Sequence, residues 1–229
     1  FGNDRIAYDD YQGRILSGDR TVPIGSFQFD SLPNSSYIIG ASSRMTFDPR
    51  NYNTIYLGRN NLLVKTTNNG QTFQTIHDFS EEVMAVEIAW SNPDVIYVVT
   101  YPDWWGVKKI WKSSDAGVSW TEITPPSTLL SGDLWVPFDI AVSSNDENIL
   151  WAARTSQYSG EYPNLDGRQV FKTLDGGATW SNVTSSDLDG ESITNITHQR
   201  GTDGGVYVGT RRAVYYKNNR QCYYHGVYE

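Results

Sequence analysis

Cysteine and histidine are scarce, which limits the chemistry open to the chain. The 229 residues include a single cysteine, Cys222, so no disulfide can form within the chain, and the paired cysteines of zinc sites are missing. The three histidines, His77, His198 and His225, lie far apart in sequence and show no metal-ligand spacing. We therefore expect neither a metal site nor a cofactor.

Clustered positive charge and long apolar runs are also missing. The chain has 18 Lys and Arg against 26 Asp and Glu, a net charge of −8, and its cations are scattered. Because a nucleic-acid interface needs clustered cations, no nucleic-acid partner is expected. No apolar run approaches the roughly 18 residues of a membrane-spanning helix, so no transmembrane segment is predicted. The start, Phe1–Asp4, shows no signal peptide and no initial Met, and we expect a processed or truncated chain.

Aromatic residues and glycine are abundant by contrast. Aromatic residues make up 14% of the chain, with eight Trp and fifteen Tyr, and there are 20 Gly. This mixture favours strands and turns, and no amphipathic stretch carries helix caps. The composition therefore predicts an all-β fold.

A short motif occurs three times. The pattern is Ser/Thr-x-Asp/Asn-x-Gly-x-x-aromatic, and the copies are Thr66–Phe73, Ser113–Trp120 and Thr173–Trp180. Asp or Asn accepts hydrogen bonds from nearby backbone N–H groups, Gly supplies a positive φ, and the aromatic residue begins the next strand. The motif therefore predicts a turn between two strands of a hairpin.

Strand-like segments surround each turn in the same order. Two strands rich in apolar or aromatic residues come first, a third ends in Lys, and a fourth follows the turn. Sequential four-stranded antiparallel units of about 40–60 residues are typical of β-propeller blades. We predict four blades in the domain 43–229, at about 43–80, 83–126, 134–186 and 192–229, the last with an eroded turn at Lys217-Asn218-Asn219. Residues 1–42 are assigned to a degenerate blade or a connecting segment.

The three motif copies resemble the Asp-box, or bacterial neuraminidase repeat. It occurs in sialidases, xyloglucanase-type glycoside hydrolases, sortilin-like ectodomains and photosystem-assembly-factor-like propellers. The resemblance implies a β-propeller with Asp-box turns between the third and fourth strands, and the number of blades favours a part of a larger propeller. It also implies that the turn residues are structural, namely Asn68, Gly70, Phe73, Asp115, Gly117, Trp120, Asp175, Gly177 and Trp180.

The face opposite these turns is the candidate binding face. In an antiparallel meander, the loop between the second and third strands and the link to the next blade lie at the end opposite the turn between the third and fourth strands. These loops are long and rich in aromatic residues, which serve as stacking platforms for sugars or as anchors for proteins. The candidate ligand-binding residues are Tyr101, Trp104, Trp105, Trp135, Tyr158 and Tyr162. The alternative is that Trp104 and Trp105 fold back to cover their own blade.

Catalysis would need acidic residues on the same loops. Glycoside hydrolysis uses two carboxylates about 5–10 Å apart, and the sequence alone does not pair any of the loop acids. These acids are Asp103, Asp133, Glu161, Asp166, Asp187, Asp189 and Glu191. A sialidase would carry an Arg-Ile-Pro segment near its start, and Val22-Pro23-Ile24 lacks that Arg. A xyloglucanase-like enzyme would place its acids on two separate propellers.

These observations favour a binding function over a complete enzyme. We predict a non-catalytic binding or scaffolding module of a larger exported or cell-surface protein, bacterial in origin, that contacts other protein domains or subunits, or polysaccharide. The alternative is a part of a carbohydrate-active, xyloglucanase-like glycoside hydrolase with an aromatic-lined glycan cleft.

Overall fold

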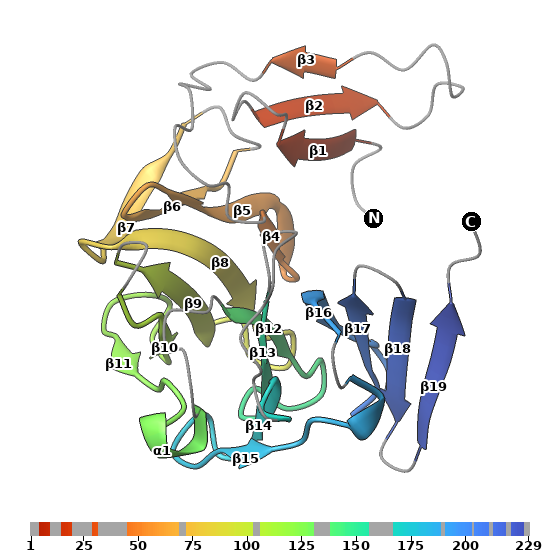
Figure 1. Cartoon of the computed structure of the whole chain (residues 1–229). Coiled ribbons are helices and arrows are strands. Elements are labelled where there is room, and N and C mark those ends of the chain that lie inside the picture. The colour runs from red at the N-terminus through yellow and green to blue at the C-terminus, as the bar shows by residue number, and fades with distance from the viewer. Residues whose placement is uncertain are drawn as a thin grey trace.

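The protein is built almost entirely of β-strands, as a computed structural model shows (Figure 1). Side chains are described for residues 45–68, 72–102, 106–130, 138–155, 167–188, 191–202 and 204–210, and the backbone is also described for the strands at 5–9, 15–19, 29–31, 213–218 and 221–226. Within these residues, no helix is long and apolar enough to cross a membrane.

Four four-stranded antiparallel sheets follow one another along the chain, each with its strands in chain order. We refer to them as blades 1 to 4. Their strands are β4–β7 (Thr46–Asp48, Asn51–Arg59, Leu62–Thr66, Gln74–Asp78), β8–β11 (Glu82–Ile88, Ile96–Tyr101, Lys109–Ser113, Thr121–Glu122), β12–β15 (Phe138–Val142, Leu150–Arg154, Val170–Thr173, Ser181–Asn182) and β16–β19 (Ile193–His198, Val206–Thr210, Ala213–Asn218, Gln221–Gly226). A three-stranded sheet precedes them, β1–β3 (Arg5–Asp9, Ile15–Asp19, Phe29–Ser31).

The first strands of the blades lie next to one another at the centre of the arrangement (Figure 1). Strand β8 contacts both β4 and β12, and β12 contacts β16. Short helical segments, α1 (Ser127–Leu130) and a 3-10 turn at Ser186–Leu188, lie in the links between blades 2 and 3 and between blades 3 and 4. The predicted order of four strands with the repeated turn between the third and fourth is confirmed in blades 1 to 3.

Both faces of the inner strands are buried, which explains their continuous apolar sequences. In β9, Ile96 and Val98 pack in a cluster shared with blade 1, whereas Tyr97 and Val99 pack in a cluster shared with blade 3. All four side chains are at most 1% exposed. Because side chains alternate between the faces of a strand, burial on both faces requires an apolar residue at every position. Three core clusters therefore lie between successive blades among the described residues.

In blades 1 to 3, a lysine near the end of the third strand covers an aromatic ring on the second strand. In the strand register, Lys65 lies opposite Tyr56 and Lys112 lies opposite Tyr97, with Nζ to ring-centroid distances of 4.9 and 5.8 Å. In blade 3, Lys172 lies opposite Trp151, and its Nζ is 4.9 Å from the centroid of the Trp151 ring. Such cation–π contacts stabilise by about 0.5–1 kcal/mol at exposed sites. They give the repeated Lys of the sequence a structural explanation.

Candidate functional site

In blades 2 and 3, each repeated turn is held by hydrogen bonds to its own aspartate side chain. In blade 2, the Asp115 carboxylate accepts from the Ser119 N–H at 2.9 Å and from the Ser113 hydroxyl at 2.7 Å. In blade 3, Asp175 accepts from the Thr179 N–H at 2.8 Å and from the Thr179 hydroxyl at 2.6 Å. The hydroxyl and backbone donors lower the pKa of both carboxyls to about 2, because they stabilise the ionised form.

The first turn makes corresponding bonds without a charge, and the direction of the bond to the hydroxyl is reversed. The Asn68 side-chain oxygen accepts from the Thr72 N–H at 3.0 Å, and its side-chain nitrogen donates to the Thr72 hydroxyl at 2.9 Å. Asn therefore replaces Asp in this turn with little change in geometry. Gly70, the predicted glycine of this turn, lies outside the described residues.

The acidic turns predict a specific dependence of stability on pH. A carboxyl whose pKa is lower in the folded than in the unfolded chain stabilises the fold above the unfolded value, and this contribution disappears as the pH falls through the folded value. For Asp115 and Asp175 the window runs from about 4 down to about 2. We expect the double variant Asp115→Asn/Asp175→Asn to remain folded at pH 7, as Asn68 indicates, and to lose less stability than the wild type in this window. Urea unfolding at several pH values measures the difference, and an unchanged acid profile would contradict the assignment.

The glycine and the aromatic residue of the second and third turns contact the blade before them. A Cβ at Gly117 would lie 2.5 Å from Ile76 of blade 1, and a Cβ at Gly177 would lie 2.5 Å from Ile123 of blade 2. Both glycines have positive φ, 94° and 98°. The Trp180 Nε1–H donates to the Ile123 carbonyl oxygen at 2.8 Å. At this end of the molecule, the repeated geometry of the turns thus joins successive blades.

The opposite end carries the loops predicted to bind a ligand. Of the six candidate aromatic residues, the structure describes Tyr101, the last residue of β9. The other five lie outside the described residues and remain predictions, namely Trp104, Trp105, Trp135, Tyr158 and Tyr162. Among the loop acids, Asp187 and Glu191 are described; Asp187 accepts from the Ser185 hydroxyl at 2.8 Å, and the Glu191 carbonyl accepts from Gln169 Nε2 at 3.1 Å.

A fully buried lysine supports Tyr101. The Lys108 side chain is 0% exposed, its Nζ donates to the Gly106 carbonyl at 2.9 Å, and it lies 3.3 Å from the centroid of the Tyr101 ring. A buried ammonium requires hydrogen bonds and aromatic contacts to offset its desolvation. Lys108 therefore holds both the Tyr101 ring and the Gly106 carbonyl in place. Sequence reasoning missed this residue, because a Lys-Lys pair is typical of a solvated surface.

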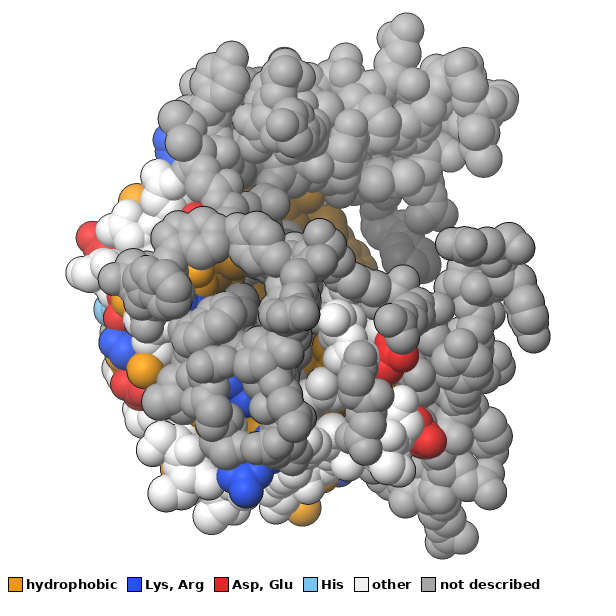
Figure 2. Space-filling model, viewed as in Figure 1, with side chains coloured by type: hydrophobic (Ala, Val, Ile, Leu, Met, Phe, Trp, Pro, Cys, Tyr) orange, Lys and Arg blue, Asp and Glu red, His pale blue; other side chains and the backbone are white. Residues whose placement is uncertain are grey.

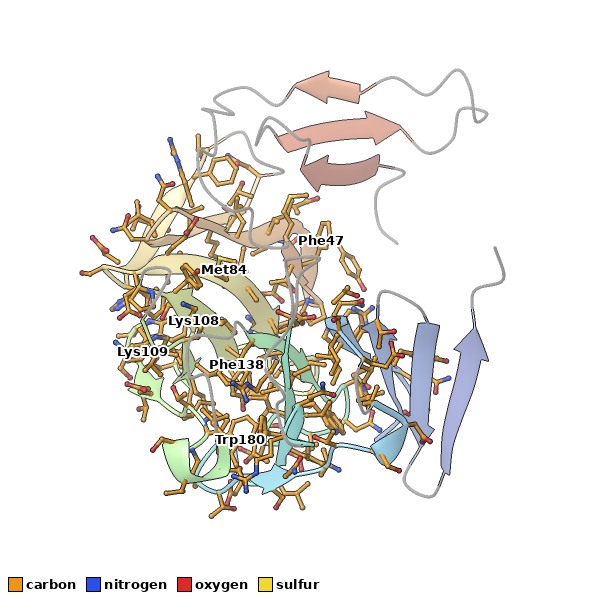
Figure 3. The ribbon with its side chains drawn as sticks, in the orientation of Figure 1. Phe47, Met84, Lys108, Lys109, Phe138 and Trp180 are labelled. Carbon is orange, nitrogen blue, oxygen red and sulfur yellow. The ribbon has the colours of Figure 1, made fainter. Side chains whose placement is uncertain are left out.

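A second polar cluster, centred on Lys109 and Glu81, lies beside Lys108 on blade 2. Lys109 forms an ion pair with Glu81 at 2.5 Å, and the other Glu81 oxygen accepts from the Thr100 hydroxyl at 2.6 Å. The Trp111 Nε1–H donates to the Thr100 oxygen at 2.9 Å. The Glu81 contact raises the pKa of Lys109. Figure 3 shows Lys108 and Lys109 side by side on this part of the ribbon.

Arginine side chains fix the link between blades 2 and 3. The Arg154 side chain is buried and donates to the Leu130 carbonyl at 3.0 Å, and Arg168 donates to the Thr128 carbonyl at 3.3 Å. Both acceptors belong to α1, whose last carbonyl groups lack partners within so short a helix. These two bonds tie α1 to strand β13 and to the segment leading into β14 in blade 3. Figure 2 shows Lys and Arg scattered among Asp and Glu on the described surface, with no large field of one sign.

The described histidines are packed against aromatic rings. His77 contacts Phe79 and Trp120 at centroid distances of 4.6 and 5.8 Å, and His198 stacks on Trp151 at 5.3 Å. The pKa of His198 is lowered mainly because the imidazole is partly buried, which disfavours its charged form. Within the described part of the chain, no group of three His, Cys, Asp or Glu side chains could hold a metal ion.

Comparison with known proteins establishes the class of the fold. No family model matches the sequence, and no curated protein matches it. Solved structures match over nearly the whole chain, at identities that carry information on the fold alone. Together with the four-stranded blades, they show that this chain is a β-propeller.

Two groups of structures illustrate the likeness. The GH74 enzyme from Niastella koreensis is 18% identical with a TM-score of 0.65, and the GH74 xyloglucanase from Xanthomonas campestris is 13% identical with a TM-score of 0.68; each match covers 97% of this chain and 36% of the other. YCF48 bound to D1 peptide is 14% identical with a TM-score of 0.53, covering 94% of this chain and 60% of the other. This chain therefore spans about a third of the length of these GH74 structures.

Proposed function

We propose that this chain is a non-catalytic binding module, an Asp-box propeller that belongs to a larger exported or cell-surface protein. Its four blades lie at about 43–80, 83–126, 134–186 and 192–229, after a degenerate blade or connecting segment at 1–42. The partner binds at the loop face, through Tyr101 and the aromatic loops above it. The observation that carries the proposal is the buried Lys108 beneath Tyr101, which gives one ring a fixed position at that face.

The two ends of the propeller differ in the contacts of their residues, and this difference supports the loop face as the binding site. At the turn end, Asp115 and Asp175 bond within their own turns, and Gly117 and Gly177 lie against the preceding blade. These groups are committed to holding the blades together. At the loop end, the connections between strands are longer than the regular repeat requires, and insertions in regular repeats are frequent carriers of function.

A protein or peptide is the partner we favour. YCF48, one of the similar structures, is described with a bound D1 peptide, so a propeller of this shape accommodates a peptide ligand. Fixed aromatic residues with a polar surround are also the usual anchors of protein interfaces. The protein partner binds through the same loop aromatic residues.

A glycan-binding function within a carbohydrate-active enzyme is the second candidate. The GH74 structures cover 97% of this chain, and one of them is named as a xyloglucanase. Aromatic side chains on loops are also suited to stack on sugar rings. In this case the chain would be one part of a longer enzyme, with its glycan cleft at the same loop face.

Substitution of the loop tryptophans tests the proposal. We expect Trp104→Ala and Trp105→Ala to reduce the affinity for the physiological protein partner by about tenfold or more, because aromatic anchors dominate interface energies. Val118→Ala is the matched control, since Val118 is 83% exposed at the turn end. Co-elution with the partner and retention on a xyloglucan gel are measured in parallel. Loss of retention on xyloglucan would favour the second candidate, and unchanged binding of both ligands would contradict the loop-face assignment.

A further inference from the structure

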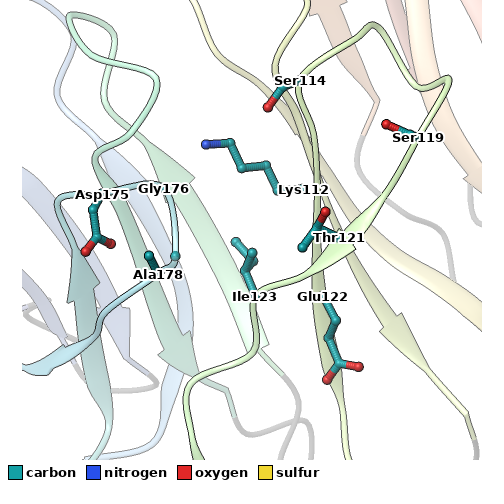
Figure 4. Close-up of a pocket in the computed structure, with 10 residues that line it drawn as sticks. Lys112, Ser114, Ser119, Thr121, Glu122, Ile123, Asp175, Gly176 and Ala178 are labelled. Atoms are coloured by element: carbon teal, nitrogen blue, oxygen red, sulfur yellow. The ribbon is translucent and has the colours of Figure 1, made fainter.

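A groove opens between blades 2 and 3 at the turn end, away from the loop face (Figure 4). Its volume is about 490 Å³. One wall is formed by the third and fourth strands of blade 2, and the other by the turn of blade 3. The lining residues are Lys112, Ser114, Ser119, Thr121, Glu122, Ile123, Asp175, Gly176, Gly177 and Ala178.

The blade 2 wall is an open strand edge. Strand β11 is the outermost strand of its sheet, so one side of its backbone has no neighbour among the described strands. The Ile123 N–H donates inward to the Ile110 carbonyl at 2.8 Å. Because the inward and outward directions alternate along an antiparallel strand, the N–H and C=O of Glu122 point outward, away from β10 and along the free edge of the sheet that borders the groove. These groups are able to pair with an added strand.

A lysine side chain lies in the groove. The Lys112 Nζ donates to Asn148 Oδ1 at 3.2 Å, which leaves ammonium protons for a further acceptor. Figure 4 shows the Lys112 side chain extending across the groove toward Gly176, with the carboxylates of Asp175 and Glu122 directed away from it. The Asp175 carboxylate is bonded within its own turn, and Glu122 accepts from the Thr124 hydroxyl at 2.9 Å. Lys112 is thus available to an incoming anionic group.

We propose that this groove binds an extended peptide segment, which pairs with the β11 edge through Glu122 and places a carboxylate on Lys112. This is a second binding surface, independent of the loop face. A peptide is favoured over a glycan for two reasons. The groove offers strand backbone that is open to pairing, and no aromatic ring is among its described lining residues, whereas sugar sites rely on aromatic stacking.

Two substitutions block the groove in different ways. A Cβ at Gly176 would clash with the Lys112 ammonium, so Gly176→Ala displaces the cation. The fold tolerates Ala there, because the matching residue of the blade 2 turn is Ala116, with a φ of 58° against 69° for Gly176. Glu122→Pro removes the outward N–H and keeps the inward pairing of β11, since proline is accepted on edge strands where its nitrogen faces outward. Glu122→Gln is its control, because it keeps the N–H and removes only the side-chain charge.

The experiment uses fluorescein-labelled peptides and fluorescence polarisation on the full chain. The probe is an amidated repeat of Thr-Glu, three units long, with the fluorescein on its N-terminal amine, and its matched probe is Thr-Gln, which carries the same label and lacks the glutamate carboxylates. We expect the Thr-Glu probe to bind about tenfold more tightly than Thr-Gln, and its affinity to fall about tenfold in Lys112→Met, Gly176→Ala and Glu122→Pro but not in Glu122→Gln. Lys112→Met remains informative if the proline variant does not fold, because methionine keeps most of the apolar stem.

Three results would overturn the proposal. The first is no polarisation change with the Thr-Glu probe at concentrations up to about 1 mM. The second is equal affinity of the wild type and Lys112→Met. The third is binding of a xyloglucan oligosaccharide that is lost in Gly176→Ala, which would make the groove a glycan site. Trp104→Ala, at the loop face, should leave peptide binding at the groove unchanged.

Discussion

Gly177→Ala should unfold the chain at markedly lower temperature and urea concentration. The added Cβ meets the Ile123 side chain at 2.5 Å, and the residue keeps a φ of 98° that L side chains rarely adopt. The backbone strain costs about 1–2 kcal/mol, and overpacking against a buried neighbour adds about 1–3 kcal/mol. A total of about 3 kcal/mol lowers Tm by roughly 6–12 °C for a chain of this size. Calorimetry or thermal circular dichroism measures the shift.

Gly201→Ala separates the cost of backbone strain from the cost of overpacking. Gly201 also has a positive φ, 81°, but no atom lies within 4 Å of the position that an alanine methyl group would take there. This variant should therefore show the backbone strain alone, about 1–2 kcal/mol. Equal losses in Gly177→Ala and Gly201→Ala would mean that the contact between the turn and the preceding blade contributes nothing to stability.

Trp180→Ala should have an effect of similar size through a different contact. The Trp180 ring packs against the core shared by blades 2 and 3, and its Nε1–H donates to the Ile123 carbonyl. Truncation of a packed Trp to Ala costs about 3–5 kcal/mol. Urea unfolding of the variant measures the loss, which is expected to exceed that of any exposed substitution at the same end, such as Leu174→Ala.

Trp180→Phe divides that loss into its parts. Phenylalanine keeps most of the ring contact and removes the donor to Ile123, so a loss of about 1 kcal/mol is expected. If Trp180→Phe were as damaging as Trp180→Ala, the hydrogen bond would dominate. If Trp180→Ala were neutral, the aromatic position of the turn would have no role in joining the blades.

Much of the fold could be predicted because the repeat is local. The bonds of Asp115 to Ser113 and Ser119 span four residues or fewer, so the turn is encoded in the motif itself. The Lys near the end of the third strand and the aromatic residue of the second also occupy fixed places in the repeat. Such short-range patterns identify the strands, their order and the place of the turn.

The contacts between blades could not be predicted from the same pattern. Nothing near Gly177 in sequence shows that Ile123, in the preceding blade, will lie against it. The burial of Lys108 was missed for the same reason, since its environment is assembled from a loop and the end of β9. The groove between blades 2 and 3 likewise depends on how two units approach each other. For the loop aromatic residues other than Tyr101, the sequence remains the source of the assignment.

The contacts that the second and third turns make with a neighbouring blade are with the blade that precedes them in the chain. Gly117 lies against Ile76, and both Gly177 and Trp180 lie against Ile123, so the second and third turns each dock at or just after the fourth strand of the blade made before them. During synthesis the receiving strand has already left the ribosome when the docking turn emerges. Each junction can therefore close as translation proceeds, without waiting for a distant segment, and the exposed apolar face of a newly made blade is covered by the next one. The propeller is suited to vectorial assembly from its N-terminal blade onward.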